Sequence, residues 1–299
     1  MKLLIVGSVA YDTVETAVGK VDCALGGAAT YASVAASYYC RPCLVGVVGD
    51  DFQDQHLQFL QSRGIDLCGL QHKPGLTFHW AGKYLPDMIG RETLETRLNV
   101  FETFDPILPP ALQDADHVFL ANIHPGLQKR VLDQARGPRL VVCDTMNLWI
   151  NTARRELEEL LPRVDYLVVN DEEIRMLTGD YNILRAARKV LRQVKKGVIV
   201  KRGEHGSTLI GREGMAIAPA FPIENLIDPT GAGDSFAGAL IGCLATAPDL
   251  SLPELKRALI HGAALSSFTV EGFSLDRLRT LSRDEIDARV QTLRELTVF

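Results

Sequence analysis

The residues best suited to chemistry lie in one run, Asp228 to Phe236, which reads DPTGAGDSF. A stretch of small and apolar residues with a helical pattern follows it directly. Glycines just before a helix allow several backbone N–H groups to point at one spot, where the helix dipole also favours negative charge. We therefore predict that the amides of Gly231, Ala232 and Gly233 form an anion hole.

One carboxylate, Asp234, would stand on the first turn of that helix and face a group that attacks a phosphoryl centre. Phosphoryl transfer needs alignment and late proton acceptance, so an ionised aspartate suffices as the base. The spacing alone is equally compatible with a glycine-rich helix start in which Asp234 only complements the dipole. The Gly-Lys pairs at 19–20 and 82–83 lack the Ser or Thr of a P-loop, and no dinucleotide-binding glycine pattern follows an early strand.

Short apolar runs alternate with helical patterns along most of the chain, beginning with Leu3 to Val6, Ala28 to Tyr39 and Leu44 to Val48. Near-continuous apolar strands in repeated β-α-β units favour a parallel sheet with helices on both faces. The predicted fold class is α/β, with a doubly wound, mainly parallel sheet. Ser207 to Ile210 and Met215 to Ala218 flank a glycine-containing turn and are predicted to form a hairpin.

Two segments, Tyr11 to Asp22 and Leu76 to Phe104, break this rhythm with period-two alternation, threonines and aromatic residues. Such patterns are typical of antiparallel strands with one solvated face. We expect a single domain, residues 1–299, that carries a small β-sheet lid built from about 11–25 and 76–104. Because apolar side chains of the lid, among them Trp80, need a cover, we further expect the lids of two copies to form a homodimer.

The composition narrows the class of partner. Of 299 residues, 46% are hydrophobic and 23% charged, which is ordinary for a globular protein. The net charge of −5 argues against binding to nucleic acid or acidic membranes, and no apolar run reaches the roughly 18 residues of a membrane helix. The N-terminus has no signal-peptide pattern, and the six scattered cysteines do not suggest a disulfide scaffold. We expect a cytoplasmic protein with a small-molecule partner.

Taken in order along the chain, these motifs resemble those of the ribokinase-like (PfkB) carbohydrate and nucleoside kinases. The resemblance spans essentially the whole chain. It rests on the run 228–236, which is highly specific, and on weaker motifs before it. Those motifs are Gly7-Ser8-x-x-x-Asp12, Gly26-Gly27 before a small-residue helix, Asn170-x-x-Glu173 after an apolar strand, and Lys201-x-Gly203-x-x-Gly206.

The resemblance implies an ATP-dependent kinase that phosphorylates a hydroxyl group of a sugar, nucleoside or polyol. It implies that Asp234 is the base, that the amides of residues 231–233 hold the phosphoryl group, and that Asp12 binds substrate hydroxyls. Gly26 and Gly27 would let the backbone approach the substrate. Substrate choice would depend on side chains of the lid and loops, with Asn122 and Asn147 as candidate contacts.

The resemblance also implies where the nucleotide and the metals bind. Asn170 and Glu173 would organise the phosphates and a hydrated Mg²⁺, although acidic residues at a helix start are also favoured by the dipole alone. The other nucleotide contacts would be Lys201, Gly203, Gly206 and, against the adenine, His261. A monovalent cation, K⁺, would lie under the anion hole, bound by Asp228 and by carbonyls of the 267–274 region.

Three departures from the family pattern bear on these expectations. Pro229 replaces a Thr but removes no amide of the anion hole. Lys201 stands where ribokinases have Thr, and it would bring a cation toward the ATP phosphates. The run that begins at Asp144 stands where many sugar kinases have Asp-x-Asn-x-Arg, but Leu148 and Trp149 replace the polar partners, so the acceptor stays open.

Two alternatives remain from the sequence alone. One is a catalytically silent protein that binds a sugar or nucleotide as a sensor or scaffold, but the complete set of Gly231, Gly233 and Asp234 favours an enzyme. The other is a kinase for a pyrimidine-type vitamin precursor, but two separate lid segments favour the sugar branch.

Overall fold

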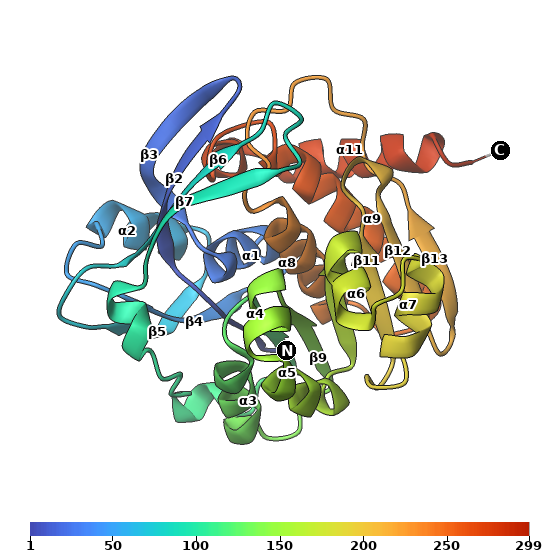
Figure 1. The fold of residues 1–299 in the computed structure, drawn as a ribbon, viewed down its shortest axis with the longest axis horizontal. Helices are drawn as coiled ribbons and strands as arrows, with labels where there is room; N and C mark the ends of the chain where they lie inside the picture. The colour runs from blue at the N-terminus through green and yellow to red at the C-terminus, as the bar shows by residue number, and fades with distance from the viewer. Residues whose placement is uncertain (299) are drawn as a thin grey trace.

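Nine strands form the main sheet of the molecule, in the order β13-β12-β11-β10-β9-β8-β1-β4-β5 (Figure 1). The computed structural model describes residues 1–298. In sheet order the strands are Gly214–Ala218, Ser207–Gly211, Gly197–Lys201, Tyr166–Asn170, Leu140–Asp144, His117–Leu120, Leu3–Val6, Pro42–Val48 and Asp66–His72. Every pair from β11 to β5 is parallel, and β12 and β13 form the predicted hairpin at one edge. The predicted doubly wound, mainly parallel sheet is confirmed.

Alternate residues of each central strand face opposite layers of helices. In β1, Leu3 and Ile5 join one apolar cluster while Leu4 and Val6 join the other, and all are buried. The first layer holds α1 (Ala28–Ala36), α2 (Asp54–Ser62), α8 (Ala232–Ala245), α9 (Leu252–Thr269), α10 (Asp276–Thr280) and α11 (Arg283–Glu295). The second holds α3 (Pro125–Gln134), α4 (Asn147–Thr152), α5 (Arg154–Leu160), α6 (Asp171–Thr178) and α7 (Ile183–Val190). Because both faces are covered, the strands are apolar at nearly every position, which explains their uninterrupted runs in the sequence.

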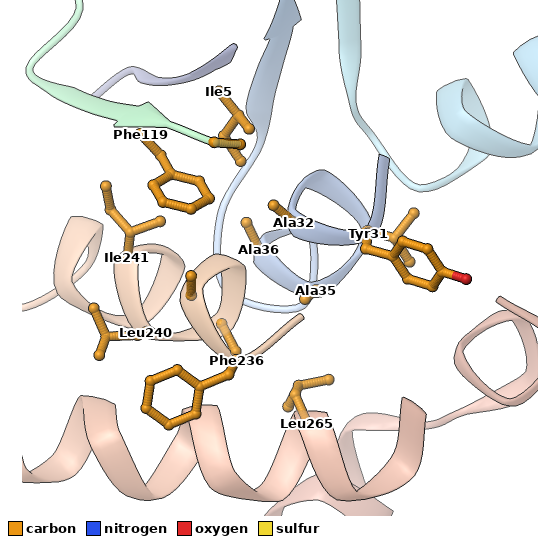
Figure 2. Close-up of a cluster of buried hydrophobic side chains, with 14 of the residues drawn as sticks. Ile5, Tyr31, Ala32, Ala35, Ala36, Phe119, Phe236, Leu240, Ile241 and Leu265 are labelled. Atoms are coloured by element: carbon orange, nitrogen blue, oxygen red, sulfur yellow. The ribbon is translucent and has the colours of Figure 1, made fainter. Parts of the chain in front are cut away.

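Helices α1 and α8 pack closely against each other through small residues. A Cβ on Gly238 would lie 2.5 Å from Ala32 Cα, and one on Gly242 would lie 2.9 Å from Ala36 Cα. Since both contacts advance by one helical turn, the two helices run in the same direction and begin at the same end of the molecule. Figure 2 shows this core, in which Phe236 of α8 and Leu265 of α9 lie between the two helices.

No helix among residues 1–298 combines the length and the apolar character needed to cross a bilayer.

A second, four-stranded sheet lies beside the main one, in the order β3-β2-β6-β7 (upper left in Figure 1). Strands β2 (Ala10–Thr16) and β3 (Gly19–Gly26) come from the first predicted lid segment, and β6 (Phe78–Tyr84) and β7 (Arg91–Arg97) come from the second. Each hairpin is antiparallel, but β2 and β6 pair in parallel, contrary to the antiparallel pairing predicted. Two hairpins that leave the core in the same sense have first strands that run in one direction, and the period-two pattern carries no signal for this.

The last predicted lid strand ends earlier than Phe104. A 3₁₀ helix spans Asn99–Thr103, because Asn99 has a φ of 52° and its Nδ2 donates a hydrogen bond to the Thr77 carbonyl at 2.8 Å. This left-handed residue turns the chain back toward the core, where Val100 and Phe104 are buried.

Candidate active site

Polar side chains gather where the parallel strands of the main sheet end. Asp144 ends β9, Asn170 ends β10 and Lys201 ends β11. Asn170 and Lys201 are direct neighbours in the β10–β11 register. Strand β1 lies between β8 and β4, so the strand order reverses there, and ligands of such sheets bind at this reversal. The sheet thus brings together residues that are far apart in the sequence.

Helix α8 begins at this edge through the glycine run. Its N-cap, Gly231, has a left-handed φ of 76°, and a Cβ there would collide with the ring of Tyr31. Asp228 holds the preceding loop, because its Oδ1 accepts a hydrogen bond from the Thr230 N–H at 2.8 Å. Residues 231–233 therefore lie at the positive end of a helix of 14 residues, as an anion hole requires.

Asp234 lies on the first turn of α8 among charged neighbours. Burial raises its pKa to about 6, the carboxylate of Asp144 adds to the increase, and the cations Lys201 and Arg91 oppose it. The carboxylate is mostly ionised at neutral pH yet more basic than an exposed aspartate, which suits a general base. A mere partner of the helix dipole needs no such enclosure, so the structure favours the chemical interpretation of Asp234.

Lys201 brings a positive charge to the anion hole. Its Nζ lies 3.0 Å from Asp144 Oδ2 and would lie 3.0 Å from a Cβ on Gly233. Burial alone would lower the pKa of this ammonium, but the carboxylates of Asp144, Glu173 and Asp234 outweigh burial and raise it. Lys201 is therefore charged, and it lies against the glycines that precede Asp234.

Asn170 and Glu173 form a capping box at the start of α6. Asn170 Oδ1 accepts a hydrogen bond from the Glu173 N–H, and Glu173 Oε2 accepts one from the Asn170 N–H, each at 2.7 Å. Burial raises the pKa of Glu173, and Lys201 opposes the increase. The helix-start role anticipated for Glu173 is thus present. Its other oxygen, Oε1, makes no hydrogen bond within residues 1–298 and is free for a ligand.

Asp12, on β2, faces the glycine pair and the loop before α8. A Cβ on Gly26 would collide with the Asp12 carboxylate, and the Gly27 backbone lies beside the same group. Burial raises the pKa of Asp12 to about 7, the Gly27 N–H opposes this, and the carboxylates of Asp228 and Asp234 add to it. The structure therefore places Asp12 within electrostatic range of Asp234, and its contact with substrate hydroxyls stays a prediction.

The two asparagines predicted to bind substrate have other surroundings. Asn122 Oδ1 accepts a hydrogen bond from Trp149 Nε1 at 2.9 Å, and its Nδ2 lies 3.1 Å from Met146 Sδ. Asn147 begins α4 and is exposed. Trp149, which replaces a polar residue of the sugar-kinase pattern, thus occupies the Asn122 carbonyl. Asn122 is half-buried and Asn147 is exposed, and the substrate contacts expected of both stay predictions.

The predicted nucleotide contacts divide into two groups. Gly203 and Gly206 lie in the tight loop that follows Lys201. His261 instead is 6% exposed on α9, with its Nδ1 3.1 Å from the hydroxyl of Tyr39. Tyr39 follows the C-terminal end of α1, whereas residues 231–233 lie at the N-terminal ends of α1 and α8. The adenine contact predicted for His261 stays a prediction, because the next residue, Gly262, packs against Phe236 near the start of α8.

Three residues of this region escaped the sequence analysis. Tyr31 points away from the alanines of α1 (Figure 2), and its buried hydroxyl has no hydrogen-bond partner within residues 1–298. Tyr84 OH lies 3.2 Å from Thr230 Oγ1 and so links the small sheet to the loop before α8. Arg91, paired with Tyr84 in the β6–β7 register, lowers the pKa of Asp12, Asp234 and Glu173 against their burial. The one available signal was a tyrosine within a helix of small residues.

Comparison with known proteins identifies the family. The protein-family model described as "pfkB family carbohydrate kinase" matches residues 2–277 of the sequence. The chain belongs to this family. A cytidine kinase of Thermococcus kodakarensis is 32% identical over 247 residues, which cover 81% of this pfkB-family chain and 87% of that protein.

Solved structures share the fold of this pfkB-family chain. A ribokinase-II-like protein of E. coli in complex with ATP and Mg²⁺ superposes with a TM-score of 0.81 at 21% identity, covering 97% of this chain and 99% of that one. The nucleoside kinase of Methanocaldococcus jannaschii superposes with a TM-score of 0.78 at 20% identity, covering 97% and 98%. At these identities the structures bear on the fold alone.

Membership in the pfkB family confirms the predicted activity at the level of the family. The chain is an ATP-dependent phosphotransferase with a hydroxyl group of a sugar, nucleoside or polyol as acceptor. The enzyme interpretation therefore holds over the catalytically silent alternative.

Proposed function

We propose that this pfkB-family kinase transfers the γ-phosphoryl group of ATP to a hydroxyl group of a nucleoside. The observation that carries the acceptor class is the pairing of Asp12 with Trp80 between β2 and β6. Paired residues of neighbouring strands have their side chains on the same face, so an indole stands beside the carboxylate that faces Gly26. A carboxylate suits ribose hydroxyls, and an indole suits the face of a base. The similarity to a cytidine kinase supports the same class.

In this proposal each residue of the site has a separate role in phosphoryl transfer. Asp12 orients the hydroxyl groups of the acceptor, and Asp234 accepts the proton of the attacking hydroxyl. The amides of residues 231–233 receive the phosphoryl oxygens, where the N-terminus of α8 favours their charge. Each role follows from the burial, charge and position of the residue described above.

Glu173 fits a hydrated Mg²⁺ that accompanies the nucleotide. Its Oε1 is a carboxylate oxygen left over by the capping box, and Mg²⁺ keeps several waters that such an oxygen can bind. When bound, the ion neutralises charge on the phosphates. Asn170 holds the Glu173 backbone in place, and Lys201, Gly203 and Gly206 would line the nucleotide.

The acceptor is tested by a coupled assay of ADP release over nucleosides, free sugars and inositols. We expect a nucleoside to have the highest kcat/KM, with ribose and inositols at least about tenfold lower. Trp80→Leu should raise KM for nucleosides more than for ribose, because only nucleosides have a base to stack. Trp80→Phe keeps an aromatic face and serves as the control. A free sugar or inositol as the best substrate, with no change in preference in Trp80→Leu, would contradict the nucleoside assignment.

We further propose a monovalent-cation site beneath the anion hole. Asp228 is 1% exposed, and its two oxygens accept hydrogen bonds from the N–H groups of Thr230 and Ser274 at 2.8 and 3.4 Å. A bound K⁺ would stabilise this loop and the amides that follow it. We expect kcat to be about fivefold or more higher in K⁺ than in tetramethylammonium salts, the low end of typical coupling between sites. Asp228→Asn should abolish the difference in kcat between K⁺ and tetramethylammonium salts. Equal rates of the unmodified enzyme in the two salts would contradict the cation site.

The small sheet is also proposed to act as a lid that joins two copies in a homodimer. Some apolar residues on which this expectation depended, Val14, Val100 and Phe104, are covered by the chain itself. Val18 and Leu94 remain 59% and 58% exposed. We expect light scattering at tens of micromolar to give twice the 32.8 kDa of one chain. Leu94→Asp should halve that mass, whereas Ile107→Asp, equally exposed but outside the small sheet, should not. A single-chain mass for the unmodified protein would defeat the dimer.

A further inference from the structure

Lys201 and Asp144 form a buried ion pair that stability alone does not explain. Their side chains are 19% and 4% exposed, and Nζ lies 3.0 Å from Oδ2. Taking both charges out of water is costly, and apolar replacements of such pairs are often neutral or stabilising. The neighbouring strand β10 ends in the neutral Asn170 at the paired position, so a strand can end here without a charge. The presence of the Lys201–Asp144 pair is therefore better explained by a chemical role than by fold stability.

Asp144 is fixed from two sides. Its Oδ1 accepts a hydrogen bond from the Thr145 N–H at 2.8 Å, and its backbone carbonyl accepts one from Gln128 Nε2 at 2.9 Å. The remaining oxygen, Oδ2, holds the Lys201 ammonium. A carboxylate held this way confines a flexible lysine side chain to one position.

That position adjoins the anion hole. Lys201 Nζ would lie 3.0 Å from a Cβ on Gly233, whose amide lies at the start of α8. An ammonium has three N–H donors, and within residues 1–298 Asp144 accepts from one of them. A phosphoryl group held by the amides of residues 231–233 would meet the other donors.

We propose that Lys201 is a catalytic cation that binds the transferring phosphoryl group in the transition state, and that Asp144 positions it. The inference rests on the kinase reaction proposed above. The acceptor oxygen forms a bond to the γ-phosphorus, the bond from that phosphorus to the β–γ bridging oxygen breaks, and the acceptor proton passes to Asp234. ADP leaves with the bridging oxygen. Lys201 keeps all its protons and counterbalances charge on the phosphoryl oxygens.

The same pair acts on Asp234 with opposite signs. Burial raises the pKa of Asp234, Asp144 raises it further, and Lys201 lowers it. The charged and titratable groups around Asp234 are Asp144 on β9, Lys201 on β11, Arg91 on β7, Asp12 on β2 and Tyr31 on α1. Loss of Lys201 should therefore move the acid limb of kcat/KM to higher pH, and loss of the Asp144 charge should move it to lower pH. This opposition reports that both charges lie beside Asp234.

Lys201→Met is the decisive variant. We expect kcat to fall about 10²–10³-fold, as for removal of one donor to a transition-state oxyanion. By calorimetry, ADP with aluminium fluoride, a mimic of the transferring phosphoryl group, should bind at least about tenfold more weakly, whereas ADP alone should bind within about threefold of wild type. Lys196→Met is the matched control, because Lys196 pairs with Asp165 at 3.7 Å at the opposite end of β11, and it should change neither quantity.

Wild-type kcat in Lys201→Met, or unchanged affinity for ADP with aluminium fluoride, overturns the proposal. If Lys201→Met does not fold, Asp144→Asn and Lys201→Arg are used instead. The proposal then fails if the acid limb of kcat/KM does not move to lower pH in Asp144→Asn. It also fails if the acid limb of Lys201→Arg does not stay near the pH found for wild type. If the enzyme uses an acceptor other than a nucleoside, only the acceptor assignment fails. The binding of ADP with aluminium fluoride needs no acceptor and still decides the role of Lys201.

Discussion

Asp234→Asn is expected to lower kcat by about 10²–10⁴-fold while the affinity for ATP stays within a few fold. The amide has the shape of the carboxylate but cannot accept the acceptor proton. In the wild type the pKa of Asp234 is about 6, so kcat/KM should fall as the pH drops through that value and the carboxylate becomes protonated. The measurement is a pH profile of both enzymes with the best acceptor.

A matched variant separates this role from an effect on the helix dipole. Asp284 lies on the first turn of α11, is exposed, and stands outside the site. Asp284→Asn removes the same charge from a helix N-terminus and should cost only about 0.3–1 kcal/mol of stability with no loss of kcat. Near wild-type turnover in Asp234→Asn would show that Asp234 is not the base.

Gly231→Ala is expected to be the most damaging change in the loop before α8. The residue has a φ of 76°, and its new methyl group would overlap the ring of Tyr31, which is buried and cannot retreat. The backbone strain and the overlap should each reduce the free energy of unfolding by about 1–3 kcal/mol. Since the loop must shift, kcat should fall as well, by about tenfold or more.

Urea unfolding and steady-state kinetics measure these two effects. Gly137→Ala is the control, because Gly137 has a φ of 64° but nothing lies within 4 Å of the added Cβ. It should show the strain alone and leave kcat unchanged. If both variants lose the same stability and both keep full activity, the contact with Tyr31 does not hold the anion-hole loop in place.

The main sheet and the start of α8 were predictable because local patterns determine them. Apolar runs such as Leu3–Val6 are uninterrupted only when both faces of a strand are covered, and a glycine run before small residues indicates a helix N-terminus. The motif residues on β9, β10 and β11 then converge because parallel strands end at a common edge. Asp144, which directly follows the apolar run Leu140–Cys143, reaches this edge for the same reason.

The rest depended on contacts that no local pattern records. The parallel β2–β6 pair joins segments far apart in the chain, and nothing in either segment names its partner. Arg91 and Tyr84 reach the site only because that pair forms. The contact of His261 with Tyr39 likewise joins two helices far apart in the chain. From the sequence, Glu173 could serve either the helix start or a ligand. In the structure one carboxylate oxygen caps α6 and the other is free, so the two roles are compatible.

The parallel pairing of β2 with β6 makes the small sheet a late element of folding. Ala10 pairs with Phe78, so the pairing closes a long loop that contains α1, β4, α2 and β5. Closing a loop costs chain entropy before any contact offsets it, and the elements inside must already be ordered to bring its ends together. Backbone amides of β6 and β7 should exchange with solvent through a partial opening, because β7 is exposed at nearly every position. Those of β1 and β8 should exchange only on global unfolding, because both strands are buried at every position, although their pairing also closes a long loop. Because Asp12 lies on β2, an acceptor that binds there would stabilise the one part of the molecule that opens first.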